Sequence, residues 1–414
     1  MAISRRDFIK LAAASPAAVA GAGALAGAGG LLSAEALADA AETPVVKRYN
    51  DLGKTGIKVS DLSLGGGGLT SPDVVRHAID HGMTFVDTAP DYGKSEETIG
   101  EAIKDSSVRA KVTIQTKFCR PGGYPGHLNP GTPVAKILEM VDGSLKRLQT
   151  DHIDILLIHA VGERGGAADV KRAQDPNFHE AILALKKSGK IRFSGCSSHG
   201  GGLESNIGWA IDSAPAGLFD TFLLSYNYLA GKSMKALVAK AKAAGKGVMV
   251  MKTLRGVTED KAVTLLGKYG KNIAHSAMKW VWDNGADGLV VTMESIGKQK
   301  AYLGASGGTL SALEKETLER YAAYVTGDTC RIACGDVCES ACPYDVAIAE
   351  TLRHDMYYTD YGDQRRGMEG YARLGARRAD ACASCVDTPC VKACEHDLPV
   401  RDLLRAADDR LRWS

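Results

Sequence analysis

One short stretch, Phe85–Gly93, places an acid and a tyrosine together directly after an apolar run. Asp87 ends that run, and Tyr92 follows five residues later. Two later apolar runs end on ionisable residues, the first on Lys117 and the second on His159. If the runs are parallel strands of a barrel, the four side chains meet at the C-terminal face, where such barrels do chemistry. The pattern predicts a proton-transfer site.

The four residue types suit the reduction of a carbonyl group. Hydride transfer leaves an alkoxide that must gain a proton, and Tyr92 is the candidate donor. A free tyrosine titrates near ~10, and a cation such as Lys117 beside it is expected to lower that pKa. Asp87 would hold Lys117 in place, and His159 would orient the carbonyl oxygen. Each residue alone has an ordinary structural explanation, and the ordered set favours the catalytic one.

The elements that must position these residues alternate between strand-like and helix-like segments. The predicted strands are Val59–Leu64, Thr84–Asp87, Val112–Lys117, Ile153–His159, Ile191–Cys196, Thr221–Ser225, Gly247–Met251 and Gly288–Thr292. Helix-period segments lie between them: Pro72–His81, Glu96–Asp105, Pro133–Leu148, Phe178–Lys187, Ser233–Ala244 and Ile273–Asp283. Eight such units over 45–326 predict an α/β fold of the (β/α)8 TIM barrel type.

A doubly wound sheet is the competing fold. That fold would place a G-x-G-x-x-G turn after its first strand. The chain has Gly65–Gly68 there, which lacks this spacing and opens no helical pattern. We therefore predict a tight turn close to the substrate mouth.

Several segments together resemble the aldo-keto reductase superfamily. Arg48–Ser60 is similar to its opening hairpin and first strand, and Gly189–Gly195 to its fifth strand. The resemblance implies a catalytic tetrad of Asp87, Tyr92, Lys117 and His159. It also implies hydride transfer between NAD(P)H and a small carbonyl or alcohol substrate.

The resemblance implies cofactor contacts that this chain matches only in part. Ser197 matches the first residue of the family's Ser-Asn pair, and Ser198 replaces the Asn. Met251 and Lys252 stand where an aromatic residue usually stacks on the nicotinamide. Lys298 could reach a 2′-phosphate. NADP(H) is the cofactor that the family implies, and NAD(H) remains open.

Eight of the ten cysteines follow the barrel in two groups of four. They are Cys330, Cys334, Cys338 and Cys342, then Cys382, Cys385, Cys390 and Cys394. Both groups keep the final x3 spacing of the bacterial C-x2-C-x2-C-x3-C-P run, and Pro343 completes the first. The tail resembles the mainly helical, ferredoxin-like extension of some aldo-keto reductases, which implies two 4Fe–4S clusters. Disulfides and zinc are the alternatives.

The spacing of the first cysteine group argues against one straight helix. Four residues at steps of four drift by about 40° a step on a helix, so the outer two diverge by about 120°. A shared arrangement, in which Cys342 crosses to the second group, relaxes this constraint.

The N-terminal segment Ser4–Lys10 resembles a twin-arginine export signal. A weakly apolar stretch, Leu11–Leu37, follows it, with cleavage expected after Ala38 or Ala40. Its many Gly and Ala residues favour a cleaved signal over a membrane anchor. The resemblance implies the Tat translocase as an export partner and a periplasmic or exterior location. The predicted domains are the signal peptide 1–40, the barrel 45–326 and the extension 327–414.

Charge excludes one class of partner. The chain has 51 basic and 49 acidic residues, and no basic stripe indicates nucleic acid. The leading interpretation is therefore an oxidoreductase of the aldo-keto reductase type that carries iron–sulfur clusters. The alternative is an exported electron-transfer protein that uses the barrel as a scaffold and serves a redox partner protein. Nicotinamide moves two electrons together and a cluster moves one, which keeps this alternative open.

Overall fold

The computed structural model describes residues 44–162, 171–255, 257, 259–325, 330–331 and 337–412. Every described residue belongs to the unit Thr43–Ser414. The predicted export signal and Cys334 therefore lie outside the described residues. Within the described ranges, every helix is too short or too polar to cross a lipid bilayer.

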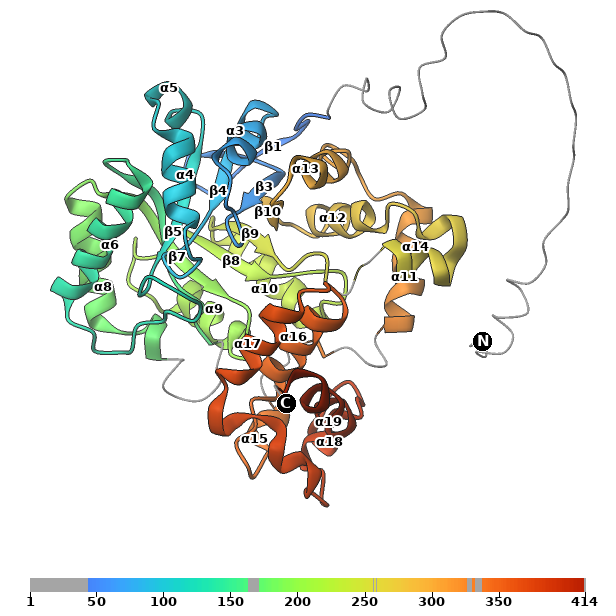
Figure 1. Cartoon of the computed structure of the whole chain (residues 1–414). Coiled ribbons are helices and arrows are strands. Elements are labelled where there is room, and N and C mark those ends of the chain that lie inside the picture. Colours follow the sequence, from blue (N-terminus) through green and yellow to red (C-terminus); the bar gives the residue numbers. More distant parts are fainter. Residues whose placement is uncertain are drawn as a thin grey trace, which may run out of the picture. The chain divides into compact units, whose positions relative to one another are not determined.

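Eight parallel strands close into a barrel, as predicted (Figure 1). The strands are β3 (Leu62–Gly65), β4 (Phe85–Asp87), β5 (Thr113–Phe118), β6 (Ile153–Ile158), β7 (Ile191–Ser198), β8 (Thr221–Ser225), β9 (Gly247–Met251) and β10 (Gly288–Thr292). They pair in chain order, and β10 closes the ring on β3. The doubly wound alternative is thereby excluded.

The first predicted strand is wrong in one respect, because Val59–Leu64 is two elements. Residues Lys58–Ser60 form β2, which pairs antiparallel with β1 (Tyr49–Asp51), and the barrel begins only at Leu62. Asp61 separates the two. Its buried carboxylate accepts hydrogen bonds from the Leu62 N–H at 2.8 Å and the Ser306 hydroxyl at 2.7 Å, which fixes the chain at this point.

Strand β6 shows why the barrel strands are apolar throughout. Ile155 and Leu157 face the barrel interior, while Leu156 and Ile158 join the core between the sheet and its helices. Successive residues on a strand point to opposite faces, so a sheet covered on both faces needs an unbroken apolar run. The same run delivers His159 directly to the end of the strand.

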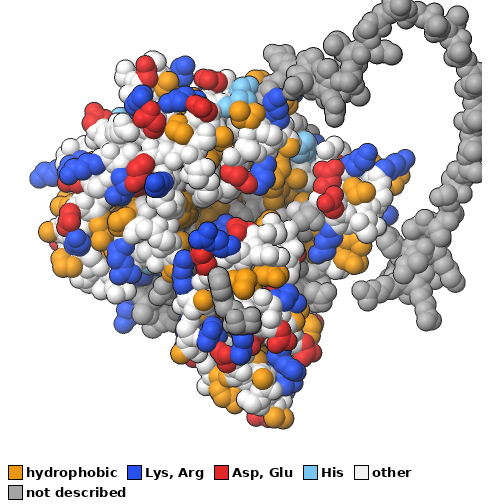
Figure 2. Space-filling view, viewed as in Figure 1, with side chains coloured by type: hydrophobic (Ala, Val, Ile, Leu, Met, Phe, Trp, Pro, Cys, Tyr) orange, Lys and Arg blue, Asp and Glu red, His pale blue; other side chains and the backbone are white. Residues whose placement is uncertain are grey.

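Helices surround the barrel and connect its strands. They are α3 (Pro72–Asp80), α4 (Ser95–Ile103), α5 (Ser106–Arg109), α6 (Val134–Leu148), α8 (Pro176–Lys187), α9 (Leu203–Asp212), α10 (Lys232–Ala243), α11 (Glu259–Leu266), α12 (Ile273–Asp283), α13 (Ile296–Leu303) and α14 (Ala312–Val325). Helix α6 buries Ile137, Val141, Leu145 and Leu148 on one stripe, at the spacing of an amphipathic helix. Basic and acidic side chains are interspersed on the face seen in Figure 2.

The C-terminal segment forms a group of short helices with its own core (Figure 1). They are α15 (Val337–Ser340), α16 (Ile348–Thr359), α17 (Gln364–Ala372), α18 (Pro389–Ala393) and α19 (Val400–Leu411). The core combines apolar side chains, such as Leu398 and Leu404, with the buried cysteines Cys338, Cys382 and Cys390. The extension is therefore helical and rich in cysteine, as predicted. Helix α15 ends before Cys342, so the described part of the first cysteine group does not follow one straight helix.

Candidate active site

The barrel strands bring the four predicted catalytic residues to one mouth. Asp87 is the last residue of β4, Lys117 lies near the end of β5, and His159 follows β6. The Lys117 ammonium lies 2.7 and 2.9 Å from the two Asp87 carboxylate oxygens and donates to the Thr88 carbonyl at 2.7 Å. Both side chains are buried, at 1% and 4% exposure. An ion pair this deeply buried is fixed in position and orientation.

A second donor clamps the same carboxylate. The Gln115 amide nitrogen donates to Asp87 Oδ1 at 2.8 Å. Gln115 is fully buried on β5, two residues before Lys117, so the two side chains point into the same side of the strand. The sequence interpretation missed Gln115, although its i−2 spacing from Lys117 could have indicated it.

Tyr92 lies over this ion pair. The Lys117 Nζ atom is 4.9 Å from the centroid of the Tyr92 ring. The His159 ring is 5.7 Å away in an edge-on arrangement. The structure therefore brings Asp87, Tyr92, Lys117 and His159 together, although they come from four separate positions along the chain.

The expected lowering of the Tyr92 pKa is wrong for this arrangement. Burial raises the pKa of Tyr92 well above its usual value, and the carboxylates of Asp87 and Asp91 raise it further. The Lys117 charge does not outweigh these effects, because the Asp87 carboxylate partly offsets it at hydrogen-bonding distance. Tyr92 is consequently a neutral phenol at physiological pH, which suits a proton donor more than a base.

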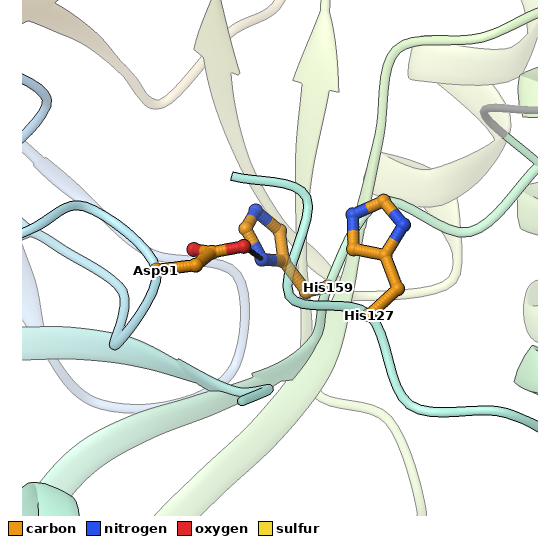
Figure 3. A group of neighbouring side chains, drawn as sticks. All are labelled: Asp91, His127 and His159. Carbon is orange, nitrogen blue, oxygen red and sulfur yellow. Dashed lines mark ion pairs between the residues drawn. The ribbon is translucent and has the colours of Figure 1, made fainter. Parts of the chain in front are cut away.

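Two further residues enter the mouth that the sequence interpretation did not single out. Asp91 and His127 lie beside His159, with the His159 Nδ1 atom 3.3 Å from Asp91 Oδ2 (Figure 3). Burial alone would raise the pKa of Asp91, but its contact with His159, the Gly126 N–H and the His127 ring lower it to about 2. The loop Gly122–Pro130 delivers His127 to the site as a buried side chain.

Cys119 lies close to Asp91 but is not a reactive thiol. It is fully buried at the end of β5, and burial raises its pKa well above the usual range. A nucleophilic cysteine needs a lowered pKa and some exposure. Cys119 therefore serves as a buried packing residue.

The two serines predicted to hold a cofactor are engaged with the barrel itself. Ser197 Oγ accepts from the Ala160 N–H at 2.8 Å, and the Ser198 hydroxyl donates to the Val161 carbonyl at 2.6 Å. Both side chains are buried, at 1% and 0% exposure. They fasten β7 to the turn after β6, which leaves little capacity for a nicotinamide carboxamide.

The other three predicted cofactor residues are more accessible. Met251 and Lys252 are half-buried at the end of β9, and Lys252 has a positive φ of 57°. Lys298 is exposed near the N-terminus of α13 and forms an ion pair with Glu294. The Glu294 carboxylate thus already compensates the charge of Lys298.

In the tail, one described cysteine of the first sequence group lies among cysteines of the second group. Burial, and then the neighbouring thiols of Cys342, Cys390 and Cys385, raise the pKa of Cys382 to about 12. Cys342 of the first group thus lies with three cysteines of the second. The nine cysteines that the structure describes form no disulfide with one another.

The tail also contacts the barrel mouth. Arg353 on α16 donates to His199 Nδ1 at 2.7 Å, and Arg373 donates to the Tyr124 carbonyl. Because an arginine can only donate, His199 Nδ1 is the acceptor and its Nε2 carries the proton. That Nε2 lies 3.2 Å from the Tyr124 hydroxyl. None of these four residues was predicted, because no local pattern links them.

Similar proteins place this geometry in a family. A model of the aldo/keto reductase family matches residues 70–281, which is about half of the chain. Aldo-keto reductase YhdN of Bacillus subtilis is 39% identical over 127 residues, covering 27% of this chain and 37% of its own length. L-galactose dehydrogenase of Arabidopsis thaliana is 32% identical over 213 residues, covering 48% and 62%. The matches thus cover less than two thirds of these relatives.

A solved structure agrees on the fold. Aldo-keto reductase AKR11C1 from Bacillus halodurans superposes with a TM-score of 0.52 at 21% identity, covering 66% of this chain and 95% of that one. This likeness speaks for the (β/α)8 barrel alone. The family model, which runs from the turn before α3 to α12, shows that the chain belongs to the aldo/keto reductase family.

Proposed function

We propose that this protein is an exported oxidoreductase that interconverts a small carbonyl compound and its alcohol with NAD(P)H, using Tyr92 as the acid and base. The observation that carries the proposal is the Tyr92 ring lying 4.9 Å from the ammonium of a buried Lys117–Asp87 pair. It occurs at the strand ends of a barrel that belongs to the aldo/keto reductase family.

The side chains of the site control the transfer of a proton to the substrate oxygen. When bound, NAD(P)H supplies a hydride to the carbonyl carbon. Tyr92 gives its hydroxyl proton to the carbonyl oxygen, so that hydride and proton together yield the alcohol. An alkoxide is a stronger base than a phenolate, so the transfer is favourable even from a tyrosine with a raised pKa. In the reverse direction, the Tyr92 phenolate takes the proton back.

The other three residues prepare this transfer. The Lys117 cation stabilises the phenolate that forms beside it, and Asp87 holds the ammonium in place at 2.7 Å. His159 lies edge-on to the Tyr92 ring and can donate a hydrogen bond to the carbonyl oxygen. The dry surroundings strengthen each of these electrostatic contacts.

The mouth fits a nicotinamide cofactor through some of the predicted residues. Met251 and Lys252 are accessible at the end of β9, and a lysine there suits an anionic dinucleotide. Ser197 and Ser198 are bonded within the barrel, so a nicotinamide would be held differently from the family's Ser-Asn pattern. NADP(H) follows from the family, and NAD(H) is the alternative that the experiment below includes.

We also propose two 4Fe–4S clusters in the C-terminal extension. One set is Cys342, Cys382, Cys385 and Cys390, supported by the mutual proximity of their thiols. The other is Cys330, Cys334, Cys338 and Cys394, in keeping with the packing of α15 against α18. In the bacterial ferredoxin run, the cysteine before proline serves the other cluster, as Cys342 before Pro343 would. Zinc is the alternative for either set.

Location follows from the N-terminal sequence alone. Ser4–Lys10 resembles a twin-arginine signal, and this pathway carries folded proteins, which lets clusters be inserted before export. The Tat translocase would be a transient partner, and the mature protein would act in the periplasm or outside the cell.

A second function has its own observation in favour. The tail contacts His199 and Tyr124 at the mouth, and the two cofactor serines are engaged. Both facts suit an electron-transfer protein that uses the barrel as a scaffold and exchanges electrons with a partner protein. The tetrad would then have lost its hydride role.

One set of measurements separates the two functions. The purified holoprotein is titrated with NADPH and with NADH, and iron, sulfide and zinc are counted per chain. Tight nucleotide binding, with turnover that Tyr92→Phe abolishes without weakening that binding, supports the enzyme. Turnover that survives Tyr92→Phe contradicts the hydride mechanism.

The control and the remaining outcomes are equally specific. Tyr269→Phe changes an exposed tyrosine on the barrel and should leave turnover unchanged. Absence of nucleotide binding together with reducible clusters favours electron transfer. About four irons and four sulfides for each cysteine set are expected, and an iron-free active protein would remove the clusters.

A further inference from the structure

Three side chains with metal-ligand chemistry come together in the barrel mouth, and the proton-transfer mechanism uses only one of them. Asp91 comes from the loop after β4, His127 from the loop after β5, and His159 from the end of β6. Each offers a ligand atom within 4.8 Å of the other two. Figure 3 shows the three side chains side by side, with the Asp91 carboxylate facing Nδ1 of His159.

We propose that Asp91, His127 and His159 form a binding site for a divalent transition-metal ion such as Zn²⁺ or Fe²⁺. Two imidazoles and one carboxylate are a ligand set that these ions take, with positions left for water or substrate. Metal–ligand bonds of about 2.0–2.2 Å would draw the ligand atoms slightly closer than they now lie.

Burial favours this interpretation over a surface cluster. Asp91, His127 and His159 are 2%, 5% and 2% exposed. Asp91 Oδ1 and His159 Nδ1 lack a hydrogen-bond partner among the described residues, although Nδ1 lies 3.3 Å from Asp91 Oδ2. Buried polar atoms without partners are costly, and an ion between them would satisfy both.

The surrounding chain holds the ligands in place. The Gly126 N–H donates to Asp91 Oδ2 at 2.8 Å, and Arg120 N–H donates to the Gly126 carbonyl at 2.7 Å. A Cβ on Gly126 would lie 2.3 Å from the Arg120 carbonyl, so only glycine permits this approach. The same tight loop therefore orients Asp91 and positions the adjacent His127. Such outer contacts are typical of metal sites.

The ion would also act on the proposed catalytic histidine. Coordination through Nδ1 of His159 fixes the proton on Nε2, which makes that nitrogen the donor toward a carbonyl oxygen. This consequence rests on the proposed function, whereas the metal site itself does not.

The test counts metal in the holoprotein and needs no turnover. Wild type, Asp91→Asn, His127→Gln and a control, His179→Gln, are dialysed against Zn²⁺ and then against metal-free buffer. His179 is a partly buried histidine on α8, outside the three ligands. Wild type and control should keep one zinc per chain more than either ligand variant. Equal zinc in all four proteins would overturn the site.

A second measurement decides the matter if the ligand variants do not fold. Mn²⁺ prefers carboxylate and imidazole ligands to thiolates, so the tail cysteines compete poorly for it. Titration of wild type, followed by electron paramagnetic resonance, should show one bound Mn²⁺ that Zn²⁺ displaces. Absence of bound Mn²⁺ at millimolar concentration would contradict the site. Tyr92→Phe should keep the ion, so that failure of the site and failure of the catalytic proposal remain distinguishable.

Discussion

At the scale of single residues, the buried Lys117–Asp87 pair organises the site. Burying the pair costs desolvation energy. Its mutual attraction, the hydrogen bond that Gln115 donates to Asp87 and the Thr88 carbonyl that accepts from Lys117 offset this cost. A pair of this kind is weak as a source of stability but intolerant of losing one member. The role of the pair is therefore to position the Tyr92 ring.

This argument predicts an asymmetry between single and double substitution. Lys117→Met leaves the Asp87 carboxylate buried without its cation and should cost about 3–5 kcal/mol of folding free energy. The double variant Asp87→Asn/Lys117→Met removes both charges and should recover a substantial part of that loss. Equilibrium denaturation of the three proteins measures the difference. Equal destabilisation of the single and double variants would contradict the role of the uncompensated charge.

At the scale of elements, the barrel depends on close approach of neighbouring strands. Gly195 on β7 has no room for a side chain, because a Cβ would lie 1.8 Å from the Thr221 carbonyl of β8. Gly195→Ala should therefore force the strands apart and cost about 1–3 kcal/mol or more. Gly208 on α9 has open space, and Gly208→Ala should stabilise the protein by about 0.5–1 kcal/mol. Thermal unfolding of the two variants should move in opposite directions.

Helix α19 gives a prediction about pH. Burial opposes ionisation of Asp408, but hydrogen bonds from Arg412 and Tyr371 outweigh it and lower its pKa. A carboxyl whose pKa is lowered on folding stabilises the fold above its unfolded pKa, near ~3.9, and loses that contribution as pH falls through the folded value. The protection factors of the α19 amides against hydrogen exchange should therefore fall on acidification below about pH 4.

The matched variants sharpen this test. Asp408→Asn should lose about 1–3 kcal/mol of protection at neutral pH and show a flatter dependence on acid. Asp409→Asn, exposed at the next position of the same helix, should behave as wild type. An unchanged pH response in Asp408→Asn would show that another group controls the acid sensitivity of α19.

At the scale of the whole molecule, the tail and the barrel are joined through buried charge. Arg353 is 2% exposed, pairs with Glu350 and donates to His199 on the barrel. Arg255 on the barrel donates in return to the Cys330 carbonyl of the tail. Any chemistry in the tail is therefore coupled structurally to the residues that line the mouth.

Removing one of these contacts should weaken the attachment of the C-terminal tail to the barrel. Arg353→Met leaves Glu350 buried without its cation, so amides of α16 should exchange at least tenfold faster, equivalent to about 1.4 kcal/mol. Arg365→Met changes an arginine that is 86% exposed and should leave exchange of α16 unchanged. Hydrogen exchange read by mass spectrometry reports both. Identical exchange in the two variants would mean that other contacts hold the tail.

The sequence by itself determined the barrel and the residues at its strand ends. Apolar runs and helical spacing are local patterns, so β5 to β10 lie within two residues of their predicted bounds. Asp87, Lys117 and His159 could be found because each directly ends or follows such a run. The break at Asp61 within the predicted strand Val59–Leu64 could not be predicted, because it depends on Ser306, which lies 245 positions away.

Only the tertiary structure decided what surrounds those residues. Asp91 and His127 meet His159 through two irregular loops, and Arg353 reaches His199 across 154 positions. No period or motif encodes such contacts, since they arise where loops and separate elements pack together. The pKa of Tyr92 shifts opposite to the expected direction for the same reason. Burial and two carboxylates outweigh the Lys117 cation, whose charge Asp87 partly offsets.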